Sequence, residues 1–220
     1  MKKSNNIFLA LLILVLLPSC NAFRSDGNPE QADASAIFQN NIVSPHPLHA
    51  DGDVNAVIEI PAGTLEKWEL DKMSGKIVRD SIDGKPRTIK YLGYPGNYGF
   101  IPETLLSKEE GGDGDPLDIL IIGPPVERGS VVKCKIIGVL YLLDRGEQDD
   151  KLIAISTASP MYTVNSLAEL NNKYNAMTEI LQLWFTNYKG PGMMVSRGFG
   201  DSAEAIEILI DALEEYDSRK

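Results

Sequence analysis

The chain has 220 residues, of which 43% are hydrophobic and 24% charged, and its formal net charge is −10. This length and composition are typical of a globular protein with one domain and a substantial core. The acidic excess argues against binding to nucleic acid or to an anionic membrane through bulk electrostatics.

The first 19 residues are predicted to be a lipoprotein-type signal peptide. Lys2 and Lys3 precede an apolar run, residues 7–17, that is too short for a permanent membrane span. The following sequence L-P-S-C resembles the bacterial lipobox, which predicts that Cys20 is lipidated. We therefore expect an exported lipoprotein anchored in the bacterial cell envelope, at the outer membrane or the periplasmic face in a Gram-negative host. The alternative is an ordinary secretory signal with an incidental Cys20.

Residues 20–53 are predicted to be a flexible tether that follows the lipidated cysteine. They are rich in Asn, Ser, Ala, Asp and Pro and show little hydrophobic periodicity. His46 and His49 could bind a metal, but their Pro-rich context favours a solvated linker. The globular domain is predicted to span residues 54–220.

Strand patterns dominate the first part of this domain. Strands are predicted at residues 54–60, 76–79, 88–91, 117–122, 131–143 and 152–155, with a polar turn at 81–86. The alternation K-W-E-L-D places Lys67 and Glu69 on one strand face. Cys134 lies in another alternating stretch and is interpreted as a small buried hydrophobe.

The C-terminal third is predicted to be helical. Ser166 with Glu169, and Asp201 with Glu204, have the spacing of capping boxes. Between these two capping signals, apolar residues recur at helical spacing: Met177, Ile180, Leu181, Trp184, Phe185 and Tyr188. A second apolar set with helical spacing follows Glu204: Ile206, Leu209, Ile210 and Leu213. Strands followed by helices predict an α+β fold, a β-barrel with helices packed outside.

Three carboxylates, Asp113, Asp115 and Asp118, lie within the six-residue run D-G-D-P-L-D. Such close carboxylates repel one another unless a cation neutralises them, and hard oxygen ligands suit Mg²⁺ or Ca²⁺ better than Zn²⁺. The alternative is an acidic turn, since Asp and Gly are common in turns.

The run D-G-D-P-L-D-I resembles the signature of the soluble, family I inorganic pyrophosphatases. Other segments resemble the family in the same order: Glu59 in V-I-E-I-P-A, Lys67 and Glu69 in E-K-W-E-L-D-K, Tyr94 and Tyr98 in Y-P-G-N-Y-G, Asp144, Asp149 and Lys151 in G-V-L-Y-L-L-D-R-G-E-Q-D-D-K-L, and Tyr188 and Lys189 in F-T-N-Y-K. The resemblance covers residues 54–190. It implies a small closed β-barrel of the OB type, with a five-stranded core and flanking α-helices.

The resemblance further implies Mg²⁺-dependent hydrolysis of pyrophosphate to two orthophosphates, with several ions per active site and Mn²⁺ or Zn²⁺ as substitutes. Asp113, Asp118 and Asp149 would bind the first activating Mg²⁺, and Asp118 would bridge to a second. Asp144 and Asp149 would hold a metal that arrives with the substrate. Glu59 would contact a further ion.

By the same resemblance, Asp115 would be the general base for the attacking water. The phosphate-binding side chains would be Lys67, Arg87, Tyr98, Lys151, Tyr188 and Lys189. The side chains with catalytic roles would be Asp115, Tyr98, Lys67 and Lys151. Tyr94 would hydrogen-bond within the site, and Glu69 would orient its neighbours.

The sequence departs from the family pattern between Glu69 and Tyr94, where it is longer than in the common bacterial enzymes. The phosphate-binding arginine expected there is therefore Arg87 or, alternatively, Arg79. The family resemblance implies a homo-oligomer, a hexamer. A tethered N-terminus is compatible with this assembly, and the oligomeric state stays open. Two rival functions are a non-catalytic, exported Ca²⁺-binding lipoprotein and an exported phosphate-binding module on the same fold.

Overall fold

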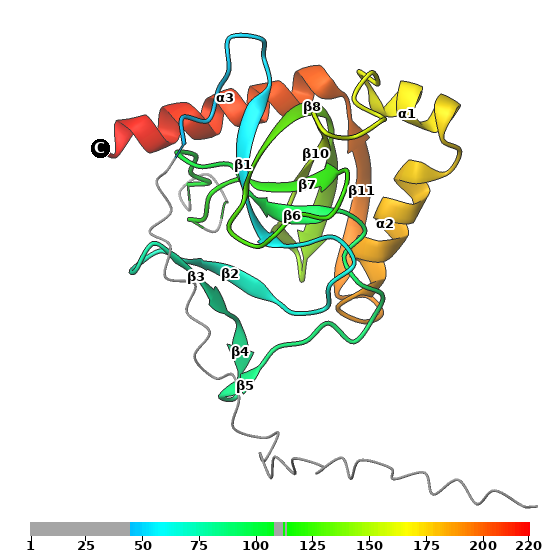
Figure 1. The fold of residues 1–220 in the computed structure, drawn as a ribbon. Coiled ribbons are helices and arrows are strands. Elements are labelled where there is room, and N and C mark those ends of the chain that lie inside the picture. Colours follow the sequence, from blue (N-terminus) through cyan, green and yellow to red (C-terminus); the bar gives the residue numbers. More distant parts are fainter. Residues whose placement is uncertain (1–44, 108–111, 113) are drawn as a thin grey trace, which may run out of the picture. The chain divides into compact units, whose positions relative to one another are not determined.

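The computed structural model describes residues 45–107, 112 and 114–220. A closed ring of five strands forms the centre of this part of the chain (Figure 1). In order around the ring, the strands are β1 (Val54–Ile60), β6 (Asn97–Phe100), β7 (Asp118–Ile122), β10 (Lys151–Ser156) and β8 (Val131–Asp144). β1 pairs with both β6 and β8, and this double pairing closes the barrel. The predicted α+β fold with a five-stranded barrel is confirmed.

Among the described strands, β8 is the longest and pairs with the largest number of neighbouring strands. It pairs antiparallel with β1, with β10 and with two further strands, β9 (Glu147–Gln148) and β11 (Met194–Gly200). Register shifts in its pairing with β10 and β11 mark bulges, which allow a strand to bend. The residues predicted as a long strand or a bent pair of strands, 131–143, therefore form one continuous strand.

The barrel strands are apolar on both faces because each face is covered. In β7, Leu120 and Ile122 belong to one apolar cluster, while Ile119 and Ile121 belong to another. The first cluster includes residues of α1 (Leu167–Lys173) and α2 (Met177–Asn187), and the second includes residues of α3 (Ser202–Ser218). Strands buried on both sides lose the alternating pattern and become continuous apolar runs.

The helix starts agree with the sequence signals. Ser166 accepts a hydrogen bond from the backbone N–H of Glu169 and caps α1, as predicted. The Glu169 carboxylate accepts from the N–H of Asn165 instead of Ser166, so the second bond of the predicted capping box does not form. Asp201 and Glu204 form a complete capping box at α3. Ile210 was predicted to lie on the apolar face of α3, and this is wrong because Ile210 is 47% exposed.

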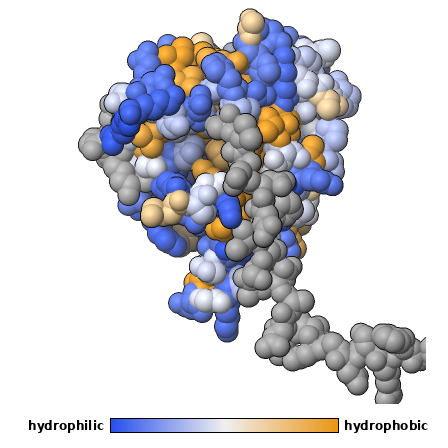
Figure 2. All heavy atoms as spheres, turned by 60° about the vertical axis from the view of Figure 1, so that its left-hand side comes forward, coloured by the Kyte–Doolittle hydropathy of each residue, from blue (hydrophilic) through white to orange (hydrophobic). Residues whose placement is uncertain are grey.

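Two short hairpins lie beside the barrel. β2 (Trp68–Asp71) pairs with β3 (Lys76–Arg79), and β4 (Ser81–Ile82) pairs with β5 (Lys85–Pro86). The second hairpin contains the predicted polar turn, with its turn at residues 83–84, and projects from the body with a largely hydrophilic surface (Figure 2). The predicted strand at residues 88–91 is wrong, because only a single bridge, between Glu66 and Thr88, forms there.

β6 and β11 have no counterpart in the sequence prediction. β6 contains Gly99, where a Cβ atom would overlap the carbonyl group of Val57. This glycine lets β6 approach β1 closely, and it also removes a side chain from the strand pattern. β11 separates α2 from α3, so the C-terminal third is not purely helical.

Residues 45–53 pack against the barrel. Leu48 forms a bridge with Val54, and the hydroxyl of Tyr162 donates to the buried Asp53 carboxylate at 2.7 Å. The predicted signal peptide, Cys20 and most of the predicted tether lie outside the described residues. Within the described ranges, no helix is long and apolar enough to cross a membrane.

Cys134 is fully buried in β8, as predicted, and burial raises the pKa of its thiol well above the usual range. In the full chain carrying Cys20→Ser, we expect the native protein to resist Ellman's reagent, since the thiol is both shielded and protonated. When the protein is unfolded in guanidinium chloride, Ellman's reagent should react with one thiol per chain. Fast labelling of the native protein would contradict this burial.

Candidate active site

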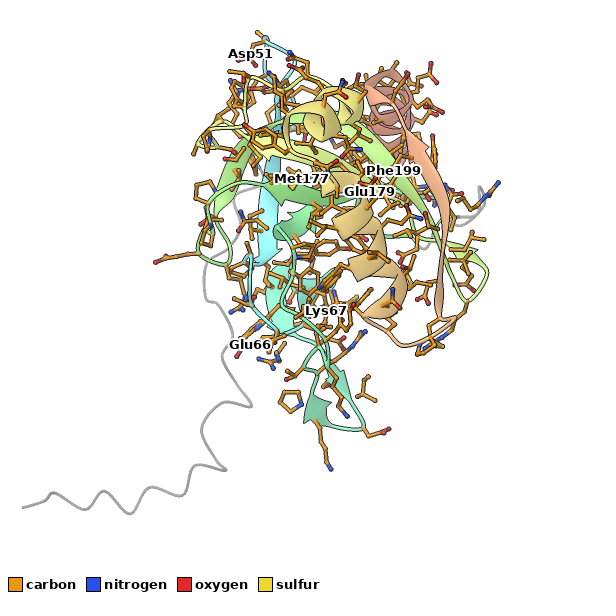
Figure 3. The ribbon with its side chains drawn as sticks, turned by 90° about the vertical axis from the view of Figure 1, so that its right-hand side faces the viewer. Asp51, Glu66, Lys67, Met177, Glu179 and Phe199 are labelled. Atoms are coloured by element: carbon orange, nitrogen blue, oxygen red, sulfur yellow. The ribbon has the colours of Figure 1, made fainter. Side chains whose placement is uncertain are left out.

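A pocket of about 330 Å³ opens at one end of the barrel, and most of the predicted site residues line it. They are Glu59, Lys67, Glu69, Arg87, Tyr94, Tyr98, Asp115, Asp118, Asp149, Lys151, Tyr188 and Lys189. Asp144 does not line the pocket but forms an ion pair with Lys189, which does. Asp113 lies outside the described residues. Figure 3 shows Lys67 at this end of the molecule and Asp51 at the opposite end.

Strand order explains why distant residues meet here. β7 and β10 run parallel, with Leu152 opposite Ile119, so their first residues, Asp118 and Lys151, lie at the same end of the sheet. The strand face predicted from K-W-E-L-D also holds, because Lys67 Nζ and Glu69 Oε2 lie 3.8 Å apart at the pocket.

Lys151 is the electrostatic centre of the pocket. Its side chain is 3% exposed, and Nζ lies 2.5 Å from both Asp118 Oδ2 and Asp149 Oδ1. Burial alone would lower the pKa of Lys151, but the two carboxylates more than offset this and raise it. Lys189 Nζ adds a second cation, 2.7 Å from Asp144 Oδ2 and 3.9 Å from Asp149 Oδ2.

Glu59 and Asp144 are carboxylates whose burial is only partly compensated by hydrogen bonds and ion pairs. Glu59 is 5% exposed and accepts one hydrogen bond, from the N–H of Leu70 at 2.7 Å. Burial raises the pKa of Glu59 to about 8, although nearby Lys67 opposes the shift. Asp144 Oδ1 is buried and has no hydrogen-bond partner among the described residues. Both groups would be better satisfied beside a cation.

The donor set fits a hard divalent cation. Carboxylate oxygens are the ligands that Mg²⁺ prefers. Asp144 Oδ1, a buried oxygen without a hydrogen-bond partner among the described residues, can coordinate such an ion. Ready-formed groups of three acidic, His or Cys ligands do not occur among the described residues. The ammonium group of Lys151 lies between Asp118 and Asp149, so these two carboxylates already share a positive charge.

Asp115, the predicted general base, is half-exposed at the pocket and forms an ion pair with Lys72. Lys72 Nζ also donates to the carbonyl oxygen of Gly114 at 3.1 Å. Lys72 was missed in the sequence analysis because it follows the strand β2, where two-residue alternation no longer applies. Its only sequence signal is its place at the end of E-K-W-E-L-D-K.

Three tyrosines form the apolar wall of the pocket. Tyr94 and Tyr98 lie 5.2 Å apart between ring centroids, and Tyr94 and Tyr188 lie 6.3 Å apart. Burial raises the pKa of all three phenols, with a further contribution from neighbouring acidic groups. Their hydroxyls therefore stay protonated at neutral pH and can donate hydrogen bonds to an anion.

The two candidate arginines have different places. Arg87 lines the pocket, and its guanidinium group binds Asp80 Oδ2 at 2.8 Å. Arg79 instead pairs with Glu66 at 3.2 Å and lies over the ring of Trp68. The geometry favours Arg87 as the arginine that reaches a bound anion.

The comparisons with known proteins agree with this site. The family model described as inorganic pyrophosphatase matches residues 56–217. The inorganic pyrophosphatase of Caulobacter vibrioides is 38% identical over 173 residues, covering 74% of this chain and 90% of its own. That of Campylobacter jejuni is 36% identical over 167 residues, covering 74% and 91%.

Solved structures show the same fold. The type I inorganic pyrophosphatase of Toxoplasma gondii superimposes with a TM-score of 0.73 at 28% identity, covering 80% of this chain and 88% of its own. The enzyme from Thermus thermophilus gives a TM-score of 0.67 at 27% identity, covering 81% and 99%. Because the family model spans most of the domain and relatives share more than a third of its residues, this chain belongs to the family I inorganic pyrophosphatases.

Proposed function

We propose that the chain hydrolyses inorganic pyrophosphate to two orthophosphates at this pocket. The observation that carries the proposal is the meeting of five cationic side chains with carboxylates in one cavity. The cations are Lys67, Lys72, Arg87, Lys151 and Lys189, and the carboxylates beside them include Asp115, Asp118 and Asp149. Phosphoryl transfer requires mainly positioning and charge cancellation, which such a set of residues can supply.

The family generally uses Mg²⁺, which would be held by Asp118, Asp149, Asp144 and Glu59 and would supply charge cancellation and a water of lowered pKa. The chain's own cations bind and orient the phosphate oxygens, and the protonated tyrosines donate hydrogen bonds to them. A carboxylate oxygen of Asp115 takes the proton from the attacking water. Asp113 completes the predicted ligand set by resemblance.

Orthophosphate release from pyrophosphate tests this proposal directly. We expect fast release in the presence of Mg²⁺ and loss of release when a chelator is added, with recovery when Mg²⁺ is restored in excess. The control is a circular dichroism spectrum showing that the chelated protein stays folded. A folded protein that binds phosphate or Ca²⁺ without turnover would instead identify a binding lipoprotein on this fold.

Asp80→Asn is expected to raise the KM for pyrophosphate by about tenfold while kcat changes less. Asp80 and Arg87 flank the β4–β5 hairpin, and their ion pair fixes the guanidinium group at the pocket. A hydrogen bond to a charged group contributes about 1.5 kcal/mol at the low end, which corresponds to about tenfold. Asp83→Asn, at the exposed tip of the same hairpin, should leave KM unchanged. Equal KM values for both variants would contradict the role of Asp80.

The export and anchoring of this enzyme are also part of the proposal. They are supported by the paired lysines, the short apolar run and the L-P-S-C sequence at Cys20, all of which precede the region matched by the family model. In a bacterial host fed labelled palmitate, we expect label in the protein and recovery in membranes. Cys20→Ala should lose both. Unlabelled protein in the cytosolic fraction would contradict anchoring.

The hexamer implied by family resemblance stays a prediction. Sedimentation velocity of the detergent-solubilised protein would test it.

A further inference from the structure

Trp184 lies behind the tyrosine wall and contacts two of its members. Its ring stacks on Tyr188 with centroids 4.5 Å apart and planes 11° apart, and it meets Tyr94 at 4.5 Å and 47°. Trp184 is 4% exposed and does not itself line the pocket. One buried side chain therefore supports two pocket tyrosines that come from segments far apart in the sequence.

Trp184 also connects α2 to the segment that carries Tyr94. Its indole N–H donates to the carbonyl oxygen of Leu92 at 2.9 Å, two residues before Tyr94. Phe185 also packs against Trp184, with ring centroids 5.1 Å apart and planes 85° apart. The position of the indole is thus fixed by one hydrogen bond and by packing.

The hydroxyls of Tyr94 and Tyr188 have no such direct restraint. In the part of the chain that the structure describes, neither hydroxyl makes a hydrogen bond to a protein atom, although both side chains line the pocket. Their orientation before substrate binds therefore depends on ring packing. Trp184 provides the closest of these ring contacts for each of the two tyrosines.

We propose that Trp184 is a positioning residue for pyrophosphate hydrolysis, which holds the Tyr94 and Tyr188 rings so that their hydroxyls meet the phosphate oxygens. The inference rests on the proposed function of the pocket. Hydrogen-bond donors that are already in place bind an anion without the cost of ordering them, so misplaced phenols weaken substrate binding. Loss of the indole would leave Tyr188 without its stacked neighbour and would release the Leu92 carbonyl.

A double-mutant cycle between Trp184 and Tyr188 tests this role. We expect Trp184→Leu to lower kcat/KM by about tenfold or more, mainly through KM, because the phenols bind the substrate. In a protein already carrying Tyr188→Phe, the same change should have a clearly smaller effect, since one of the positioned hydroxyls is gone. Trp184→Phe keeps an aromatic ring at the site and should restore much of the loss.

Leu183→Ala is the matched control, since Leu183 is the neighbouring residue on the exposed side of α2 and is 61% exposed. It should leave both kinetic constants unchanged. If Trp184→Leu does not fold, the cycle is run with Trp184→Met, whose flexible side chain fills buried space without an aromatic ring. Equal effects of the Trp184 change with and without the Tyr188 hydroxyl would overturn the inference while leaving the proposed function intact. A folded parent protein without pyrophosphate hydrolysis would overturn both.

Discussion

Asp115→Asn is expected to lower kcat for pyrophosphate hydrolysis by about 10²–10⁴-fold, the usual contribution of a general base. The amide has nearly the same shape as the carboxylate but cannot take a proton from water. Asp115 is half-exposed, and its ion pair with Lys72 is solvated, so the free energy of unfolding should change by less than about 1 kcal/mol. Stopped-flow or colorimetric phosphate release, together with urea unfolding, gives both quantities.

Asp217→Asn is the control for this variant, because Asp217 is an exposed carboxylate paired with Lys220 at 2.9 Å on the far end of α3. It should behave as the parent protein in both assays. If Asp115→Asn keeps more than about a tenth of the parental kcat, a different group takes the proton.

Lys151→Met should be the most destabilising single change at the pocket. It removes a buried ammonium group, which leaves Asp118 without this ion pair and Asp149 with only the longer contact to Lys189 at 3.9 Å. Breaking a buried ion pair typically costs about 3–5 kcal/mol, and we expect a loss of about 3 kcal/mol in chelator, because both carboxylates are partly exposed. Hydrolysis should fall as well, since Lys151 lines the pocket proposed to bind phosphate.

Urea unfolding with chelator and with excess Mg²⁺ separates the two roles of Lys151. If the carboxylates are metal ligands, Mg²⁺ should recover part of the lost stability by binding only the folded state. Lys173→Met provides the comparison, since its exposed pair with Glu169 is worth less than about 1 kcal/mol. Equal stability of Lys151→Met and Lys173→Met would mean that the buried ion pairs contribute little.

The sequence predicted the fold well wherever local pattern determines structure. The bounds of β1 and β3, the long β8 and the caps of α1 and α3 follow from apolar runs and from Ser or Asp at helix starts. β6 was missed because Asn97 and Gly99 interrupt its pattern, and its partner β1 is distant in the sequence. Strands of this kind are specified by tertiary pairing more than by their own residues.

For the site, residue identity and order were sufficient to find the pocket, but the pairing of charges was not predictable. The distance between Lys151 and Asp118 depends on the parallel register of β7 and β10. The choice between Arg87 and Arg79 depends on the path of the β4–β5 hairpin, and the contact of Lys72 with Asp115 depends on the end of β2. Each of these is a long-range relation that no local spacing encodes.

The closure of the barrel has a consequence for how the chain folds. Val57 pairs with Phe100 on one side and Val131 on the other, so β1 cannot complete its hydrogen bonds until much of the chain is present. Such non-local pairing gives a high contact order and folding in roughly milliseconds to seconds. While β8 is absent, the apolar β1 offers an unpaired edge to other chains. Truncations that remove β8 should therefore aggregate rather than fold into a smaller domain.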